Sequence, residues 1–459
     1  MRFILCILVL CSELSFGDTF KTILHLADFH MDVDYSVNGE KSQMCHNVGN
    51  QSKTNKLGSY GDYMCDSPEA LVAYTLKQAR SYVQSPDLVL WTGDNVPHIQ
   101  GYSWDYVYRC IDKTTSLIKN EFYGINIIPT FGNHDYAPAN AYDTYSDLYS
   151  RTFNLWQNYI PADQKENFLR GGYYRRHIEG AVFLVLNTNL YYNVNEAYAN
   201  FTNPDDPAEM FAFMESELER ATKCPNQING GTCYSIVHIV AHIPPGAFER
   251  TPYYNWFRPQ YNERFLNITV KYASTIKWML YGHHHTDTFH IIRDESNKPV
   301  QMSLMAPAVT PWFSDLRGAG ANNPAFRIYR ASDDYTKILD IETYYVNLTQ
   351  LNNDQNGLVN FEFEYSFKAA YGLSSEINAT TMDEVVQKMK TDSETLQTYL
   401  KYNSVQWNVT TPTGDLLNAQ LCALEFSDYP RYEQCMRKGK SNNFVPQIFI
   451  FIIFLFYLL

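Results

Sequence analysis

The fold of this chain is decided by the stretch Tyr281-Gly282-His283-His284-His285-Thr286-Asp287, which follows an apolar run at 276–280. A strand that ends in glycine and then presents imidazoles two positions apart places two ring nitrogens on the same side of the chain. Both can then face a metal pair. His284 lies between them and should point to the opposite face, so we expect a structural role for it. Such a segment needs further ligands from elsewhere in the sequence.

Four other short apolar runs also end in a carboxylate, a carboxamide or an imidazole. The polar residues are Asp28 and His30 after the run at 22–26, Asp94 after 88–91, Asn133 and His134 after 127–131, and His242 after 236–240. A single polar residue at a strand end is usually a turn former or a satisfied polar group. Five such strand ends in series instead favour a metal site at one edge of a sheet in an α/β fold. Oxygen and imidazole donors without sulfur suit zinc, manganese or iron.

As a set, these blocks resemble those of the calcineurin-like metallophosphoesterases over about residues 20–310. The blocks are Asp28-x-His30, Gly93-Asp94, Gly132-Asn133-His134-Asp135, His242 and Gly282-His283-x-His285. The sequence segments around two of these blocks resemble those of the acid sphingomyelinase and acid sphingomyelinase-like phosphodiesterase branch. These segments are Gly93-Asp94-Asn95-Val96-Pro97-His98 and Ala241-His242-Ile243-Pro244-Pro245-Gly246. The resemblance implies a four-layer αββα sandwich of the metallophosphoesterase type, to which we add a small helical C-terminal subdomain.

The same resemblance implies a ligand set for two metals. One metal would be bound by Asp28, His30, Asp94 and His285, and the other by Asp94, Asn133, His242 and His283. A bridging carboxylate such as Asp94 offsets the repulsion of two dications roughly 3.5–4 Å apart. The branch resemblance points to two Zn²⁺, although the donor types alone would also suit manganese or iron. Pro97 stands where purple acid phosphatases carry a metal-bound tyrosine, which disfavours a ferric site.

Two further histidines match residues of the branch that act on the substrate. We expect His134 to be the general acid that protonates the leaving oxygen, and His98 to stabilise the phosphoryl oxygens as negative charge develops. An alternative for His98 is that it only orients a ligand. Asp287 is a candidate for fixing the tautomer of an imidazole. The implied reaction is in-line attack of a metal-bound hydroxide on a phosphodiester.

The chain divides into four predicted segments. Arg2, a following apolar run and small residues before Asp18 predict a signal peptide at 1–17. The catalytic domain would span 18–350 and a helical C-terminal subdomain 351–440. The tail at 441–459 ends in twelve apolar residues, fewer than the ~20 of a spanning helix. A GPI-attachment signal therefore fits better than a tail-anchored helix.

Cysteines and glycosylation sequons indicate an oxidising compartment. Of nine cysteines, Cys6 and Cys11 fall in the signal peptide, and spacing suggests the bridges 45–65, 224–233 and 422–435, with Cys110 left over. Connectivity does not follow from sequence alone. No cysteine lies in the five blocks, which disfavours a thiolate zinc site. The Asn-x-Ser/Thr sequons lie at Asn50, Asn200, Asn267, Asn347, Asn378 and Asn408.

Periodicity predicts strands that alternate with helices in the first half and hairpin-like strands later. Helices are expected over 67–84, with Ser67 as the capping residue, over 104–119 and over 207–222. Additional strands are expected over 181–187, 289–293, 300–305, 326–329 and 338–346. Helix-rich sequence follows from about 352, with helix starts near Thr381 and Asp392. This order predicts a layered α/β sandwich with helices outside two sheets.

The sequence therefore predicts a secreted or surface-anchored dinuclear metal phosphodiesterase that is a monomer. By resemblance its substrates would be soluble nucleotides and related diesters. A formal net charge of -13 argues against a nucleic-acid polymer as partner, and membrane contact would come through the GPI anchor. One alternative is a sphingomyelin phosphodiesterase, which the absence of an expected N-terminal saposin-type domain disfavours. The other is a catalytically idle surface binding or modulatory protein, which the complete ligand set disfavours.

Overall fold

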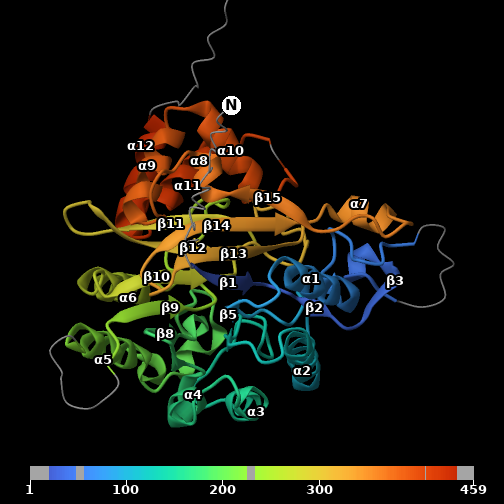
Figure 1. Ribbon diagram of the computed structural model, residues 1–459, viewed down its shortest axis with the longest axis horizontal. Helices are drawn as coiled ribbons and strands as arrows, with labels where there is room; N and C mark the ends of the chain where they lie inside the picture. The colour runs from blue at the N-terminus through green and yellow to red at the C-terminus, as the bar shows by residue number, and fades with distance from the viewer. Residues whose placement is uncertain (1–19, 48–55, 225–232, 409, 442–459) are drawn as a thin grey trace, which may run out of the picture.

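Two six-stranded sheets form the centre of the computed structural model, which describes residues 20–47, 56–224, 233–408 and 410–441. Figure 1 shows the sheets at mid-height, between the C-terminal helices and the helices of the middle of the chain. The predicted signal peptide, the sequon at Asn50 and nearly all of the predicted GPI-signal tail lie outside the described residues. Among the described helices, none combines the length and the apolar character needed to cross a bilayer.

The first sheet has the strand order β15-β14-β13-β1-β5-β6. Strands β1, β5 and β6 are parallel neighbours, whereas β13, β14 and β15 pair antiparallel. Polar blocks that follow the three parallel strands therefore leave the same edge of this sheet. The strands are β1 (Phe20–Leu26), β5 (Leu88–Trp91), β6 (Ile127–Pro129), β13 (Ala325–Ser332), β14 (Ile338–Tyr345) and β15 (Glu362–Ser366).

The second sheet has the order β11-β12-β10-β9-β8-β7. Strands β8, β9, β10 and β12 run parallel, so His242 and the 283–285 segment also leave one edge. The sequence placed all five strand ends at the edge of a single sheet, and this was wrong: three belong to the first sheet and two to the second. The strands are β7 (Tyr174–Ile178), β8 (Ala181–Val185), β9 (Ile236–Val240), β10 (Ile276–Tyr281), β11 (Thr288–Arg293) and β12 (Pro299–Met305).

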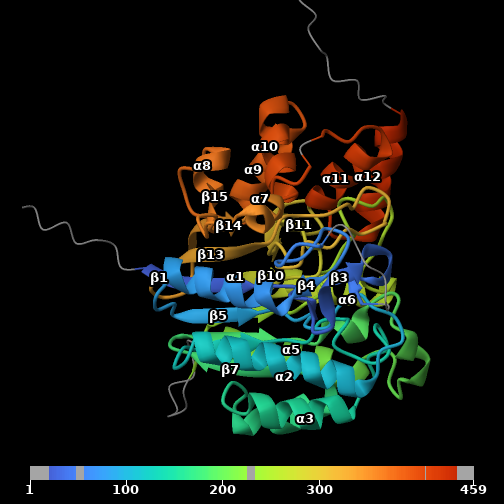
Figure 2. The same cartoon turned by 90° about the vertical axis from the view of Figure 1, so that its right-hand side faces the viewer.

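Helices cover the outer faces of the two sheets (Figure 2). On one side α1 (Glu69–Tyr82) contacts β13 and packs on α2 (Trp104–Glu121). On the other side α5 (Met210–Thr222) contacts β9, and α6 (Pro259–Lys271) contacts β11 and β12. One buried apolar cluster includes residues of both sheets, such as Leu24 and Leu280. The predicted layered α/β sandwich is confirmed. Two further helices, α3 (Asp147–Trp156) and α4 (Lys165–Gly171), come between β6 and β7 in the sequence.

Two predicted helix starts differ from the structure. Ser67 does not cap α1, because its N–H donates to the carbonyl of His30 at 3.2 Å. This bond belongs to a short parallel pairing of β4 (Ser67–Pro68) with β2 (Met31–Asp32), so Ser67 is extended and Pro68 is the N-cap. The predicted helix over 207–222 is interrupted after a 3-10 turn, since Ala208 and Glu209 have positive φ and α5 begins only at Met210.

The helices that follow residue 366 gather at one end of the molecule, next to β14 and β15, whereas the helix at 348–353 lies apart from them and bonds to the segment at 60–61 (Figure 1). The sequence did not predict β15, which pairs antiparallel with β14 and extends the first sheet. The proposed domain boundary after residue 350 stays a prediction. Strand β15 lies beyond this boundary in the sequence but belongs to the first sheet. The helices are α7 (Leu348–Asn353), α8 (Phe367–Tyr371), α9 (Ala379–Met389), α10 (Ser393–Asn403), α11 (Asp415–Glu425) and α12 (Tyr429–Ser441).

The three expected disulfides are present. They join Cys45 to Cys65, Cys224 to Cys233 and Cys422 to Cys435, while Cys110 is free and buried. The last bridge links α11 to α12, as expected. Helix α10 begins at Ser393 with Asp392 as its N-cap, as predicted, whereas α9 begins at Ala379 with a capping box made by Asn378 and Thr381.

Candidate metal centre

The predicted ligands lie on sharp turns directly after the strands. Five of the seven have a backbone in the left-handed region, which non-glycine residues rarely adopt. Such strained conformations cost of order 1–3 kcal/mol each and cluster at functional sites. Here the turns bring side chains from both sheets to a common point between the strand ends. The residues are Asp28 (φ 52°), His30 (39°), Asp94 (55°), His283 (70°) and His285 (62°).

A first group consists of Asp28, His30, Asp94 and His285, whose ligand atoms all lie within 4.8 Å of one another. His30 Nε2 is 3.1 Å from His285 Nε2 and 3.2 Å from Asp94 Oδ2. His285 Nε2 is 3.7 Å from Asp28 Oδ1. The structure therefore brings together the four residues predicted for the first metal.

A second group consists of Asp94, His242 and His283, again within 4.8 Å. His242 Nε2 is 3.1 Å from Asp94 Oδ2, 3.2 Å from His283 Nδ1 and 3.0 Å from Asn133 Oδ1. Asn133 Nδ2 donates to Asn140 Oδ1 at 2.8 Å, so the amide oxygen of Asn133 is the atom left to face the group. All seven predicted ligands thus meet, with Asp94 Oδ2 common to both groups.

The hydrogen bonds of two histidines show that these groups fit divalent cations. His30 Nδ1 lies 2.8 Å from the carbonyl of Val96, and His242 Nδ1 lies 2.6 Å from that of Thr92. A carbonyl only accepts, so each Nδ1 carries a hydrogen and each Nε2 is the atom that faces the carboxylate of Asp94, where it offers a lone pair when a cation is bound. Burial raises the pKa of Asp28 to about 7. Burial lowers the pKa of His30, but the facing Asp94 carboxylate outweighs it and raises this pKa to about 9. Lone pairs and buried carboxylates in such contact need positive charge between them, as two cations supply.

Asp135 holds the loops that carry two of the ligands. Its carboxylate accepts hydrogen bonds from the backbone N–H groups of Gly132 (2.9 Å), Asp94 (3.1 Å), Asn95 (2.7 Å) and Val96 (3.2 Å). A Cβ at Gly132 would lie 2.1 Å from Asp94 Oδ1, so only glycine permits this close approach. The sequence contained Asp135 within a block but gave no role for it.

His98 and His134 lie beside the first group. Their ring centres are 4.3 Å apart, and His98 stacks on His30 at 4.0 Å. Both line a pocket of about 250 Å³ that also contains Asp94, Asn133, His283 and His285. His134 Nδ1 is buried without a hydrogen-bond partner among the described residues, and burial lowers the pKa of this ring to about 4. Both rings are therefore within reach of a substrate in this pocket.

Two partners of His98 were missed from the sequence. Its ring stacks on Trp312, with ring centres 3.7 Å apart and planes at 13°. Its Nδ1 lies 3.0 Å and 3.1 Å from the two carboxylate oxygens of Asp66. Asp66 is buried and follows Cys65 of a disulfide. Neither partner stands at the end of a predicted strand, so the strand-end pattern carries no signal for them.

His284 does not join either ligand group. Its Nδ1 lies 2.7 Å from Glu249 Oε2, and its Nε2 accepts from Trp256 Nε1 at 2.6 Å. The Trp256 ring is 4.2 Å from that of His283 and lines the pocket. His284 therefore fixes one wall of the pocket.

The expectation for Asp287 was wrong. Its carboxylate forms a buried ion pair with Arg327 and accepts hydrogen bonds from Thr343 Oγ1 (2.6 Å) and Tyr365 Oη (2.7 Å). It contacts no histidine through a hydrogen bond in the described part of the chain. Arg327, Thr343 and Tyr365 lie on β13, β14 and β15, respectively. The carboxylate of Asp287 therefore bonds to side chains of these strands and not to an imidazole of the metal centre.

Family comparisons agree with this geometry. The sequence model of the calcineurin-like phosphoesterases matches residues 21–287. The chain belongs to the calcineurin-like phosphoesterase family. A second model, described as the acid sphingomyelin phosphodiesterase C-terminal region, matches residues 298–442 of this calcineurin-like phosphoesterase. Both matches bear out the resemblance, including the acid sphingomyelinase branch.

Named relatives of this calcineurin-like phosphoesterase cover nearly the whole chain. Acid sphingomyelinase-like phosphodiesterase 3b of Homo sapiens is 33% identical over 433 residues, 92% of this chain and 91% of the relative. Cyclic GMP-AMP phosphodiesterase SMPDL3A of Rattus norvegicus is 29% identical, with 90% and 91% covered. Sphingomyelinase phosphodiesterase C of Dictyostelium discoideum is also 29% identical, with 90% and 92% covered. The chain is accordingly a metal-dependent phosphoric diester hydrolase.

Proposed function

We propose that the chain is a secreted or cell-surface dinuclear zinc phosphodiesterase that hydrolyses soluble nucleotides and related phosphodiesters. The observation that supports this most strongly is the position of Asp94 Oδ2, 3.2 Å from His30 Nε2 and 3.1 Å from His242 Nε2. One carboxylate oxygen between two imidazole groups is the arrangement that a metal pair requires. The disulfides agree with secretion.

The two groups assign the metals in this proposal. One Zn²⁺ would be held by Asp28, His30, Asp94 and His285, and the other by Asp94, Asn133, His242 and His283. When bound, the pair supplies Lewis-acid polarisation of the phosphoryl group and lowers the pKa of water. Two of the histidines, His30 and His242, would use Nε2 atoms whose orientation is set by the Nδ1 hydrogen bonds to the carbonyls of Val96 and Thr92, as is usual for metal-binding imidazoles.

The protein's own side chains would complete the reaction. His134 Nδ1, which has no other partner among the described residues, would hold the proton that the leaving oxygen receives. The N–H of His134 donates to Asp94 Oδ1 at 2.8 Å, which keeps the ring beside the metal pair. His98 would donate to a phosphoryl oxygen from a ring held by Asp66 and Trp312. Trp256 would close the opposite wall of the pocket.

Product analysis tests the proposal. The mature chain, residues 18 to about 440, is loaded with zinc and incubated with ATP, CDP-choline and detergent-dispersed sphingomyelin in one mixture, beside His134→Ala. Release of phosphate or CMP with sphingomyelin intact is expected. Ceramide release would instead assign a lipid substrate. No product above the variant, with two metals bound, would reject a hydrolase role and leave a binding protein.

A further inference from the structure

The ring of His283 is held differently from those of His30 and His242. Its Nδ1 faces the second ligand group, 3.2 Å from His242 Nε2, whereas its Nε2 is buried without a hydrogen-bond partner among the described residues. In His30 and His242 the nitrogen that points away from Asp94 is bonded to a backbone carbonyl. A metal-binding imidazole usually donates its other N–H to such an acceptor, which fixes the plane of the ring. Another contact must therefore orient His283.

The indole of Trp256 packs directly against His283. The ring centres are 4.2 Å apart and the planes stand at 69°. The ring of Tyr192 is also nearly perpendicular to that of His283, but its centre lies farther away, at 5.4 Å. Trp256 is 4% exposed, so little water reaches this contact. An aromatic face accepts an N–H in T-shaped pairs of this kind, so the indole can replace the missing acceptor.

Trp256 is itself held by a hydrogen bond whose direction is fixed. Its Nε1 lies 2.6 Å from His284 Nε2. An indole N–H only donates, so His284 Nε2 carries no hydrogen and the single ring hydrogen of His284 is on Nδ1. That Nδ1 donates to Glu249 Oε2 at 2.7 Å. The protonated Nδ1 cannot bind a metal, although Glu249, His284 and His290 lie close enough together to hold an ion. The contact between Glu249 and His284 therefore serves to position Trp256.

The carboxylate of Glu249 is fixed by two further donors. Its Oε1 accepts from Thr286 Oγ1 at 2.6 Å and from Asn403 Nδ2 at 3.0 Å. Glu249 is 0% exposed, and a buried carboxylate is costly unless its oxygens are bonded. Rotation of this carboxylate would leave buried donors without their acceptor, so Oε2 stays directed at His284.

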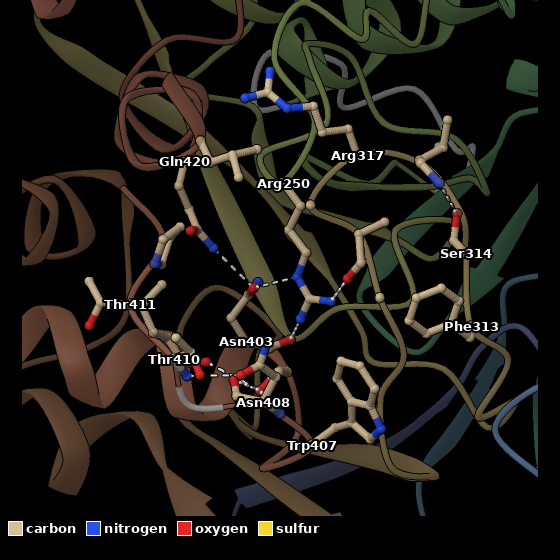
Figure 3. Close-up of a pocket in the computed structure, with 18 of the residues that line it drawn as sticks. Arg250, Phe313, Ser314, Arg317, Asn403, Trp407, Asn408, Thr410, Thr411 and Gln420 are labelled. Atoms are coloured by element: carbon tan, nitrogen blue, oxygen red, sulfur yellow. Dashed lines mark hydrogen bonds between the residues drawn. The ribbon is translucent and has the colours of Figure 1, made fainter. Parts of the chain in front are cut away.

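Asn403 brings helix α10 into this chain of contacts. Figure 3 shows its side chain between Arg250 and Gln420, in a pocket of about 510 Å³. Its Oδ1 accepts from Arg250 Nε at 2.9 Å and from Gln420 Nε2 at 3.1 Å. The two donors fix the orientation of the amide, which leaves Nδ2 to face Glu249. A residue of the C-terminal helices is thereby linked to His283 through three intervening side chains.

We propose that Glu249 is a positioning residue for the metal of the second group. Through His284 it holds Trp256 against His283, and the indole takes the place that a backbone carbonyl has for His30 and His242. Asn403 fixes Glu249, so the C-terminal helices contribute to the affinity of this metal. The inference rests on the proposed dinuclear centre and adds to it residues that lie outside both ligand groups.

Zinc binding tests the proposal without any turnover. Metal-free mature chain is titrated with zinc in competition with a chromophoric chelator, which gives a Kd for each of the two ions. Glu249→Gln keeps the shape of the side chain but has one acceptor oxygen in place of two. It should weaken one of the two Kd values roughly tenfold and leave the other within about twofold.

A second background distinguishes positioning from a general effect on stability. Trp256→Phe keeps an aromatic ring but lacks the N–H that His284 accepts. In that background Glu249→Gln should change neither Kd by more than about twofold, because no hydrogen bond to the ring is left to lose. A purely structural role of Glu249 would weaken zinc binding equally in both backgrounds, and that result would overturn the inference.

Trp256→Leu tests the indole directly and decides the matter if Glu249→Gln does not fold. It should weaken the same zinc ion roughly tenfold. Trp407→Leu is the control, since the ring of Trp407 contacts Tyr63 and Phe313 and, within the described residues, none of the candidate ligands. Unchanged zinc binding by Trp256→Leu would also overturn the inference. Failure of the wild type to bind two zinc ions would instead reject the proposed metal pair, and the inference with it.

Discussion

The Asp66 carboxylate lies 3.0 Å from His98 Nδ1 and simultaneously accepts a 2.6 Å hydrogen bond from the N–H of the same residue. Thr310 Oγ1 donates to it at 2.9 Å. The carboxylate therefore fixes His98 through both its ring and its backbone, and the disulfide between Cys45 and Cys65 restrains the segment from which it comes. A histidine held in this way keeps one tautomer and one ring plane.

Replacing this carboxylate should impair turnover more than substrate binding. We expect Asp66→Asn to lower kcat roughly 10–100-fold with a much smaller change in KM, because the amide cannot hold the His98 ring as the carboxylate does. Steady-state kinetics with bis(p-nitrophenyl) phosphate measure both constants. Asp34→Asn is the control, since the Asp34 side chain is half-exposed and 3.7 Å from Arg109. An unchanged kcat would remove the positioning role of Asp66.

If His134 is the general acid, as proposed, the effect of its removal depends on the leaving group. His134→Gln should lower kcat roughly 10²–10⁴-fold for a diester with an alkoxide leaving group. The loss should be much smaller for a p-nitrophenyl diester, because p-nitrophenolate leaves without protonation. Both rates are measured on protein whose metal content is checked by mass spectrometry. Equal losses on the two diesters would assign His134 to another task.

The shared position of Asp94 predicts how metals are lost. Asp94→Asn should reduce binding of both metals, since its carboxylate faces both imidazole groups. Asp28→Asn should mainly weaken the first group, because His285 and His30 lie there with it. Metal content after dialysis against a weak chelator distinguishes these outcomes. Loss of the same number of metals from both variants would contradict the bridging position.

The buried ion pair of Asp287 predicts a large effect on stability. Asp287→Ala should lower the free energy of unfolding by about 3–5 kcal/mol, because it leaves Arg327, which is 0% exposed, without a counter-charge. The double variant with Arg327→Met should recover part of this loss, since it removes the uncompensated charge as well. Urea unfolding of the three proteins measures the effect. A loss below about 1 kcal/mol in the single variant would show that water or another acceptor replaces the carboxylate.

His46 predicts a pH-dependent contribution to stability. The hydrogen bond that His46 donates to the Asp32 carboxylate raises the pKa of His46 above its ordinary value, with His46 Nε2 2.6 Å from Asp32 Oδ2. A raised pKa in the folded state stabilises the protein below the unfolded value of ~6.5, and this contribution is lost as the pH rises through the folded-state pKa. Between about pH 5.5 and pH 9 the wild type should therefore lose more Tm than His46→Gln. Parallel losses in the two proteins would show that this pair contributes nothing.

The sequence placed the candidate ligands more accurately than the residues around them, for a physical reason. Candidate ligands such as Asp94 and His242 directly follow apolar strands, so their place in the fold can be inferred from the chain around them. Asp66 and Trp312 contact His98 only because distant loops meet above the strand ends. No local period or spacing encodes such a contact.

The same distinction explains the errors in the fold. Helix α2 was predicted closely because its apolar stripe is continuous from Trp104 onward. Strand β15 was missed because a five-residue edge strand with a mostly polar sequence, Glu362–Ser366, has little periodic signal. Asp287 was misassigned since its partners come from three strands that the sequence does not place beside it. The candidate ligands are positioned by residues next to them in the sequence, whereas the residues that support them come from distant parts of the chain.

The pairing of β15 with β14 also limits how the chain can evolve by exchange of its C-terminal region. Strand β15 is covered by the family model of the C-terminal region, yet it pairs with β14 and supplies Tyr365 to the carboxylate of Asp287. A gene rearrangement that exchanged everything after β14 would also remove the edge of the catalytic sheet and one donor to a buried charge. The catalytic region and the C-terminal region are therefore not independent modules joined by a linker, and we expect them to be inherited together.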